Sequence, residues 1–222
     1  MGRPLTLVSA PAGFGKTTCV SEWAAVLGLP VAWLSLDPSD DDAGRFFAYL
    51  VAALQKVDEN LGREVESVLR SGQLPPVEAI STALSNDMLA LQGRFLLVLD
   101  DFQVIQDRFI LQAFEKLLAN PPPPPHLVLL TRVDPLLPLA RLRANDRMTE
   151  IRAGDLRFDG SEAGRFLNEV MGLGLCDADI AALADRTEGW IVGLQLAGLS
   201  VRGRADPSAF IAGLSGSHRF IL

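Results

Sequence analysis

A segment near the N-terminus, residues 10–18 (APAGFGKTT), has the residue types and spacing of a loop that binds phosphate groups. It matches the pattern G-x-x-x-x-G-K-[ST] except at its first position, where Ala10 replaces glycine. Glycines allow the backbone to turn so that successive N–H groups face one anion. Ala10 begins the loop and is not expected to make an essential phosphate contact. The segment therefore predicts a nucleotide-binding P-loop.

Each residue of this loop has an expected role. Backbone N–H groups around Gly13 and Gly15 wrap the phosphates, and the helix beginning at Lys16 adds the positive end of its dipole. Lys16 is expected to reach the β- and γ-phosphates and to act in catalysis, Thr17 to coordinate Mg²⁺, and Thr18 to donate to the α-phosphate. The predicted nucleotide-binding residues are Pro11, Ala12, Gly13, Phe14, Gly15, Lys16, Thr17 and Thr18.

A second motif, FLLVLDD, ends an apolar run with two carboxylates, Asp100 and Asp101. An acidic residue at the end of a buried strand beside a phosphate loop is where such folds hold magnesium. Asp100 is therefore the predicted metal ligand together with Thr17, Asp100 acting through a water molecule. A second carboxylate can orient or deprotonate the water that attacks the γ-phosphate, which is the predicted catalytic role of Asp101. A helix cap or a turn residue is the alternative for Asp101.

A third candidate, Arg132, follows the apolar run HLVLLT. Ligands of parallel sheets bind beyond the carboxyl ends of the strands, so Arg132 is expected on the same edge as the loop and Asp100. There it can contact the γ-phosphate through two guanidinium N–H groups. A surface ion pair with Asp134 or another acid is the alternative. Residues 131–134 (TRVD) also resemble the N-K-x-D motif of GTPases, but the asparagine and the lysine are both replaced, so guanine specificity is not expected.

Apolar runs alternate with helical patterns through the first 153 residues. Runs that are apolar on both sides and alternate with helices predict an α/β fold, a P-loop NTPase parallel sheet with helices on both faces. The expected strands are 5–9, 31–36, 95–99 and 126–131, with a fifth beginning at 148–151, and the expected helices are 16–27, 43–57, 77–91 and 109–119.

Two segments between these elements have unusual compositions. Residues 37–42 (DPSDDD) precede a helix, and capping with Ser39 as N-cap is favoured over a metal site. Five prolines at 121–125 predict a stiff connector between a helix and a strand, with a proline-motif ligand as the alternative.

The pattern changes after residue 153, where only helical segments follow, near 159–171, 178–185 and 190–201. The expected domains are a P-loop nucleotide-binding domain over 1–153 and a small helical domain over 154–222. The chain ends at the apolar RFIL, residues 219–222, without a helix stop signal, so we expect it to be cut from something longer.

The composition limits the classes of function. A formal net charge of −7 repels phosphate backbones, so direct DNA binding by this chain is not expected. Cys19 and Cys176 have neither disulfide nor zinc spacing, which indicates a reduced, cytoplasmic setting. The sequence contains no secretion signal and no apolar run of about 18 residues, so no membrane span is expected.

Taken together, these motifs resemble the ATPase module of the MalT-like, LuxR-type large transcriptional activators, which belong to the STAND class of P-loop ATPases and are relatives of the NB-ARC switches. The resemblance covers nearly the whole chain, and its most specific segments are DPLLPLARLR and TEGWIVGLQL. It implies ATP or ADP with Mg²⁺ as ligands. The family's functional residues map onto Lys16, Thr17, Thr18, Asp100, Asp101 and Arg132.

Two positions depart from this family. Gln103 stands where similar proteins often carry histidine. The helical part has no proline at the position where NB-ARC relatives contact the nucleotide with one. There, Trp190 either covers the adenine or, as we favour, is a buried core residue.

The resemblance implies a slowly hydrolysing regulatory switch. ADP would hold a closed form, and ATP with an inducer would favour an open form that self-associates. The family's helical-repeat sensor and its DNA-binding domain are not in this chain, and a small-molecule or protein inducer is expected to act through such domains.

Three other functions remain open. A working NTPase motor or clamp-loader-like enzyme would take an arginine from a neighbouring subunit, with Arg141, Arg143 and Arg147 as candidates. A P-loop phosphotransferase is less favoured. A degenerate, structural loop is least favoured, because Lys16, Thr17 and both aspartates are present.

Overall fold

The computed structural model describes residues 3–70, 72, 74–91, 93–122 and 125–213. The chain divides into two compact units, one formed by Met1–Ala10 with Lys16–Ile151 and the other by Pro11–Gly15 with Arg152–Leu222. Pro123, Pro124 and the RFIL end, for which the sequence predicts a connector and a chain cut from something longer, lie outside the described residues. Within the described part, no helix has the length and apolar character that crossing a membrane requires.

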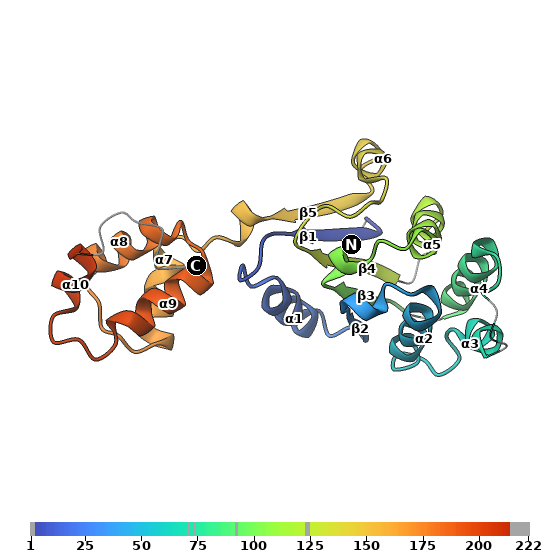
Figure 1. Cartoon of the computed structure of the whole chain (residues 1–222), viewed down its shortest axis with the longest axis horizontal. Coiled ribbons are helices and arrows are strands. Elements are labelled where there is room, and N and C mark those ends of the chain that lie inside the picture. The colour runs from blue at the N-terminus through green and yellow to red at the C-terminus, as the bar shows by residue number, and fades with distance from the viewer. Residues whose placement is uncertain (1–2, 71, 73, 92, 123–124, 214–222) are drawn as a thin grey trace. The chain divides into compact units, whose positions relative to one another are not determined.

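The first unit is built on a five-stranded sheet with the order β2-β3-β4-β1-β5 (Figure 1). Strand β4 pairs with β1 and with β3, and β3 pairs with β2, in each case in parallel. All five expected strands are present among the described residues, and the predicted α/β fold is confirmed. The strands are β1 Leu5–Ser9, β2 Val31–Ser35, β3 Phe95–Asp100, β4 Pro125–Thr131 and β5 Met148–Arg152.

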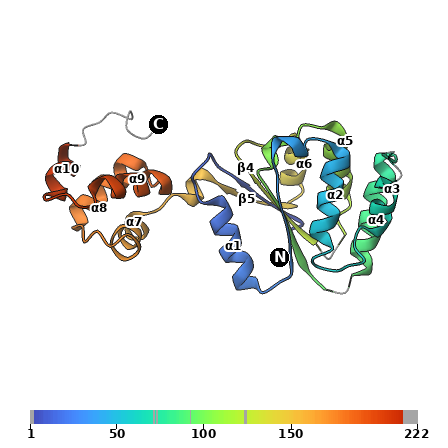
Figure 2. The ribbon, with the colours of Figure 1, turned by 60° about the horizontal axis from the view of Figure 1, so that its bottom comes forward.

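Helices cover both faces of this sheet, with α1 on one side and α2 and α5 on the other (Figure 2). This arrangement is the one that right-handed crossovers produce, because β1 connects to β2 across the sheet in one direction and β3 to β4 in the other. The helices of the first unit are α1 Lys16–Leu27, α2 Ala43–Leu54, α3 Arg63–Leu69, α4 Val77–Ala90, α5 Arg108–Ala119 and α6 Leu139–Ala144, with short 3₁₀ turns at Pro38–Asp40 (η1) and Phe102–Val104 (η2).

Side chains alternate along each strand between the two covered faces. Leu7, Leu97 and Leu129 belong to one large core cluster that also includes residues of α2, α4 and α5. His126 lies on the opposite face, where its ring meets the edge of Trp23 from α1 at a centroid distance of 5.8 Å. Both faces exclude water, which explains why the strands read as continuous apolar runs in the sequence.

Aromatic rings form the centre of the larger core. The rings of Phe46, Phe47, Phe102 and Phe114 meet edge to face, with centroid distances of 5.3 to 5.8 Å, and all four side chains are fully buried. Phe102 is the residue directly after Asp101. The aromatic cluster therefore anchors the turn that follows β3.

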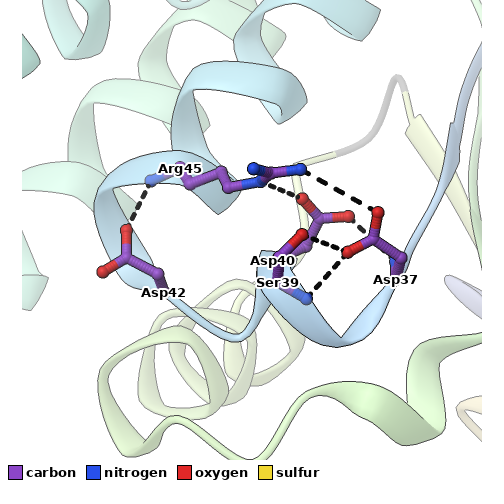
Figure 3. Close-up of polar contacts among 5 residues, drawn as sticks. All are labelled: Asp37, Ser39, Asp40, Asp42 and Arg45. Atoms are coloured by element: carbon purple, nitrogen blue, oxygen red, sulfur yellow. Dashed lines mark hydrogen bonds and ion pairs between the residues drawn. The ribbon is translucent and has the colours of Figure 1, made fainter.

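The acidic segment between β2 and α2 caps helices (Figure 3). The carboxylate of Asp37 accepts the N–H of Ser39 and caps η1, while that of Asp42 accepts the N–H of Arg45 and caps α2. Asp40 is 3% exposed and pairs with the guanidinium of Arg45 at 2.8 Å. Capping was the favoured interpretation and is confirmed, but Ser39 as the N-cap of the following helix was wrong: α2 begins at Ala43 with Asp42 as its N-cap, and Ser39 lies inside η1, where its N–H is capped by Asp37.

The second unit is helical. It consists of a 3₁₀ turn Ala153–Leu156 (η3), α7 Gly160–Gly164 continued by a π-helical segment Arg165–Val170 (η4), α8 Asp177–Thr187, α9 Ile191–Val201 and α10 Pro207–Gly213. Its core contains Leu167, Ile180, Leu183 and Leu194, all buried. Asp159 and Glu162 form a capping box at the start of α7.

Replacing Phe114 tests the aromatic core. We expect Phe114→Ala to lower the free energy of unfolding by about 3–5 kcal/mol, because a fully buried ring is replaced by a cavity. The control Leu89→Ala removes a side chain that is 56% exposed in α4 and should change the free energy by no more than about 0.5 kcal/mol. Urea denaturation followed by circular dichroism measures both, and equal losses would contradict this assignment of the core.

Candidate functional site

The carboxyl ends of β1, β3 and β4 lie side by side. Ser9 pairs with Thr131 across β1 and β4, Leu99 pairs with Leu129 across β3 and β4, and the N–H of Ala10 donates to the carbonyl of Thr131 at 3.2 Å. The segments that leave these strands are the P-loop, the aspartate pair and the chain at Arg132. All three therefore begin at one edge of the sheet, as the sequence predicts.

The P-loop has the backbone conformation that its glycines allow. Gly13 and Gly15 have φ values of 78° and 73°, in the left-handed region that side chains disfavour. Pro11 and Ala12 are exposed, as are Thr17 and Thr18 in the first turn of α1. The loop therefore offers its backbone and two hydroxyl groups to solvent at the N-terminus of a helix.

Lys16, the first residue of α1, is 8% exposed, and its ammonium group donates to the carbonyl of Ala10 at 2.8 Å. Burial lowers the pKa of Lys16, as does the charge of Arg132, whereas the charges of Asp101 and Asp100 raise it. The ammonium group is thus held at low hydration among charged neighbours. In such a place an added anion is strongly favourable.

Asp100 and Thr17 form a compact set of oxygen ligands. The hydroxyl of Thr17 donates to Oδ2 of Asp100 at 2.8 Å, and the N–H of Asp101 donates to Oδ1 at 2.9 Å. Asp100 is 6% exposed and faces α1, since it alternates with the core residues of β3. A hydroxyl and a carboxylate are ligands that Mg²⁺ accepts, and Mg²⁺ usually completes its shell with water and substrate phosphates. Among the described residues, no group of three or more acidic, histidine or cysteine side chains forms a larger metal cage.

Asp101 lies in a left-handed turn with φ 58°. Its Oδ1 accepts the amide N–H of Gln103 at 2.8 Å and lies 3.5 Å from Nε of Arg132. The side chains of Arg132 and Asp101 are 53% and 42% exposed, so the ion pair is solvated and weak. The structure thus brings Arg132 to Asp101, while Asp134 pairs with Arg143 at 3.3 Å.

One residue that sequence reasoning missed is Asp41. Its Oδ1 accepts the backbone N–H groups of Gln106 and Asp107 at 2.7 and 2.6 Å, which ties the segment after β2 to the segment after β3. Asp107 in turn caps α5 by accepting the N–H of Phe109. No sequence pattern singles out Asp41 within an acidic run, because its partners lie 65 and 66 positions away.

Trp190 belongs to the second unit, which includes the loop residues Pro11–Gly15. Its indole N–H donates to the carbonyl of Ala12 at 3.2 Å, and its ring lies 6.4 Å from that of Phe14. The side chain is half-buried, so the favoured interpretation of a buried core tryptophan was wrong. The polar indole nitrogen explains this position, because it is satisfied by a loop carbonyl at the surface.

Comparisons with known proteins identify relatives for almost the whole chain. A scan against models of protein families finds no match. The chain is 35% identical over 218 residues to the HTH-type transcriptional regulator MalT of Yersinia enterocolitica, covering 96% of this chain and 24% of that protein. It is 34% identical over 226 residues to the serine/threonine-protein kinase PknK of Mycobacterium tuberculosis, covering 99% of this chain and 20% of that protein.

The resemblance to the MalT-like regulators is thereby confirmed, and the chain spans about a fifth to a quarter of the length of the curated relatives it matches.

Solved structures agree on the fold. Cdc6p from Pyrobaculum aerophilum superposes with a TM-score of 0.54 at 13% identity, covering 92% of this chain and 57% of that one. Drosophila ORC bound to DNA gives 0.54 at 11% identity, covering 95% and 60%. The P-loop fold supports nucleotide binding.

Asp41 offers a test of the tie between the two segments. We expect Asp41→Ala to lower the free energy of unfolding by about 1–2 kcal/mol, because two backbone N–H groups lose a charged acceptor. Asp41→Asn keeps an acceptor oxygen of the same reach and should lose less than half as much. Denaturant titration of the two variants checks this, and equal losses would mean that the oxygen at this position does not hold the loop.

Proposed function

We propose that this chain is the ATP-binding, slowly hydrolysing switch module of a signal-responsive transcriptional activator. One observation carries the proposal: Lys16 and Thr17 at the start of α1 lie at the edge of the parallel sheet where β3 ends in Asp100 and Asp101, with the hydroxyl of Thr17 hydrogen-bonded to Asp100. These are the groups that a triphosphate with Mg²⁺ requires, namely backbone donors, a lysine and a few oxygen ligands.

Residues 11–18 are proposed to bind the phosphates. Lys16 would exchange the carbonyl of Ala10, its present acceptor at 2.8 Å, for β- and γ-phosphate oxygens. Its low hydration makes that exchange favourable, because a phosphate carries a full negative charge and the carbonyl only a partial one. Thr17 and Asp100 would hold Mg²⁺, which supplies neutralisation of the charge that develops on the phosphates.

Asp101 is proposed to orient and deprotonate the attacking water. Both contacts of its carboxylate fall on Oδ1, and Oδ2 makes no hydrogen bond to any described residue. Oδ2 is therefore the oxygen to which the attacking water is proposed to donate. Arg132 is proposed to contact the γ-phosphate, and its solvated ion pair with Asp101 costs little to exchange.

The regulatory role is proposed from the relatives. MalT is named a transcriptional regulator, and this chain matches only 24% of its length. DNA binding and inducer recognition would lie in other parts of a longer protein, which suits the net charge of −7 of this chain. We propose a cytoplasmic setting and self-association in the ATP state, since nucleotide can drive such a change only by binding the two states differently.

A working NTPase motor is the second candidate, and two of its three candidate arginines are already engaged. Arg143 pairs with Glu150 and Asp134, and Arg147 donates to the carbonyl of Ala119 at 2.9 Å. Arg143 thereby joins α6 to β5, and Arg147 joins the segment between them to the end of α5. This leaves the switch as the better-supported function, and rapid steady-state hydrolysis by the chain alone would contradict it.

The first experiment is calorimetric titration of Mg-ATP and Mg-ADP into the nucleotide-free chain and into Lys16→Ala. We expect saturable binding that weakens about 100-fold or more in the variant, because a charge-assisted contact of about 3 kcal/mol is lost. Lys56→Ala, which removes an exposed lysine after α2, is the control and should bind as the wild type does. No binding by folded, nucleotide-free wild type would contradict the proposal.

A second experiment separates binding from hydrolysis. Asp101→Asn keeps the shape and the acceptor oxygen but removes the base, so we expect unchanged nucleotide affinity and a rate of hydrolysis about 10²–10⁴-fold lower. Single-turnover hydrolysis of radiolabelled ATP gives the rate. If the variant hydrolyses ATP as fast as the wild type, Asp101 is a turn residue and not the base.

A further inference from the structure

Gln103 makes two hydrogen bonds that join the ends of two strands. Its amide nitrogen donates to Oδ1 of Asp101 at 2.8 Å, and its amide oxygen accepts the backbone N–H of Arg132 at 3.0 Å. Asp101 directly follows β3, and Arg132 directly follows β4. One side chain thus bridges the carboxylate proposed as the base and the backbone of the arginine proposed to contact the γ-phosphate.

The chemistry of the two partners dictates the type of side chain between them. A carboxylate only accepts hydrogen bonds and a backbone N–H only donates, so the bridge must donate at one end and accept at the other. The amide of glutamine does both without carrying charge. The two partners also fix which end of the amide is nitrogen and which is oxygen, since the reverse orientation would place two acceptors and two donors face to face.

The backbone holds Gln103 rigidly in place. Phe102 is fully buried against Phe114, and Ile105 is 4% exposed, so residues on either side of Gln103 are anchored in the core. The N–H of Ile105 donates to the carbonyl of Phe102 at 3.1 Å, which closes the η2 turn. A side chain on such a turn can fix its partners, because its own position does not depend on them.

We propose that Gln103 is a positioning residue for ATP hydrolysis. It occupies Oδ1 of Asp101 so that Oδ2 faces the attacking water, and it sets the backbone from which Arg132 reaches the γ-phosphate. The inference rests on the proposed function and extends it to a residue that touches neither nucleotide nor water. Its effect is therefore on the rate of the chemical step and not on the affinity for Mg-ADP, which has no γ-phosphate for Arg132 to contact.

Gln103→Leu is the first test, because leucine fills similar space and makes neither hydrogen bond. We expect the single-turnover rate of ATP hydrolysis to fall about 10- to 100-fold through misplacement of the base, with the Kd for Mg-ADP unchanged. Gln112→Leu is the matched control, since Gln112 is an exposed residue of α5, and should leave the rate unchanged. A wild-type rate in Gln103→Leu would overturn the proposal.

The rates of ATP hydrolysis of two further variants distinguish a positioning role of Gln103 from a merely structural one. Gln103→Glu cannot donate to a carboxylate and should be at least as slow as Gln103→Leu, although it is nearly the same shape. Gln103→His can donate from one ring nitrogen and accept at the other only while neutral. It should recover activity at high pH and lose it as the pH falls through about 6.5, an inflection that the wild type lacks at this position.

The bridge itself can be measured without turnover. Hydrogen exchange of the Arg132 amide, followed by NMR in the nucleotide-free chain, should be slow in the wild type and faster in Gln103→Leu. Equal exchange in the two chains would overturn the bridge. A wild type that binds nucleotide without hydrolysing it would instead contradict the proposed function, and the exchange at Arg132 would still decide whether the bridge exists.

Discussion

The main-chain hydrogen bonds that hold β4 between β1 and β3 in parallel register determine where Asp100, Asp101 and Arg132 lie. A shift of one strand by a single residue would turn its side chains to the opposite face. In the observed register, Asp100 points toward the face of α1, where Thr17 meets it at 2.8 Å. Both faces of the sheet are covered by helices, so the three strands are buried along their length.

Side chains after the strands then connect what the strands place side by side. Asp41 binds two N–H groups of the segment after β3, and Gln103 binds one N–H at the end of β4. Each contact satisfies backbone donors of an irregular segment that has no strand partner. Segments that would otherwise move independently at the surface are thereby fixed relative to the sheet.

Much of the fold could be predicted from the sequence because long elements carry strong patterns. Strands β1 to β4 are largely apolar runs, and α2, α4 and α5 have apolar residues at helical spacing over 12 to 14 residues. Helices α3, α6 and α10 were not predicted, since they are six or seven residues long, and α3 and α6 begin without a side-chain N-cap. Short helices are determined by packing, which a linear pattern does not contain.

The candidate site, like the fold, has a part that the sequence predicts and a part that only the structure shows. The P-loop and the aspartate pair are local patterns, so their residues could be identified and assigned to one edge before any coordinates. The bridge at Gln103 depends on a backbone N–H 29 positions away, and the half-buried place of Trp190 depends on a carbonyl 178 positions away. Partners so far apart along the chain produce no repeating pattern in the sequence, so only the folded structure shows that they meet.

The acidic segment after β2 also bears on how this protein could change during evolution. Asp40 accepts the backbone N–H of Asp37 but also pairs with the side chain of Arg45, and this second contact depends on the residue at position 45, so positions 40 and 45 should vary together among relatives. Asp41 meets only backbone N–H groups, which every residue except proline retains. Position 41 should therefore remain acidic among relatives, whatever residues occupy positions 106 and 107. Positions 40 and 41 should thus show different patterns of substitution, although both are aspartates in this sequence.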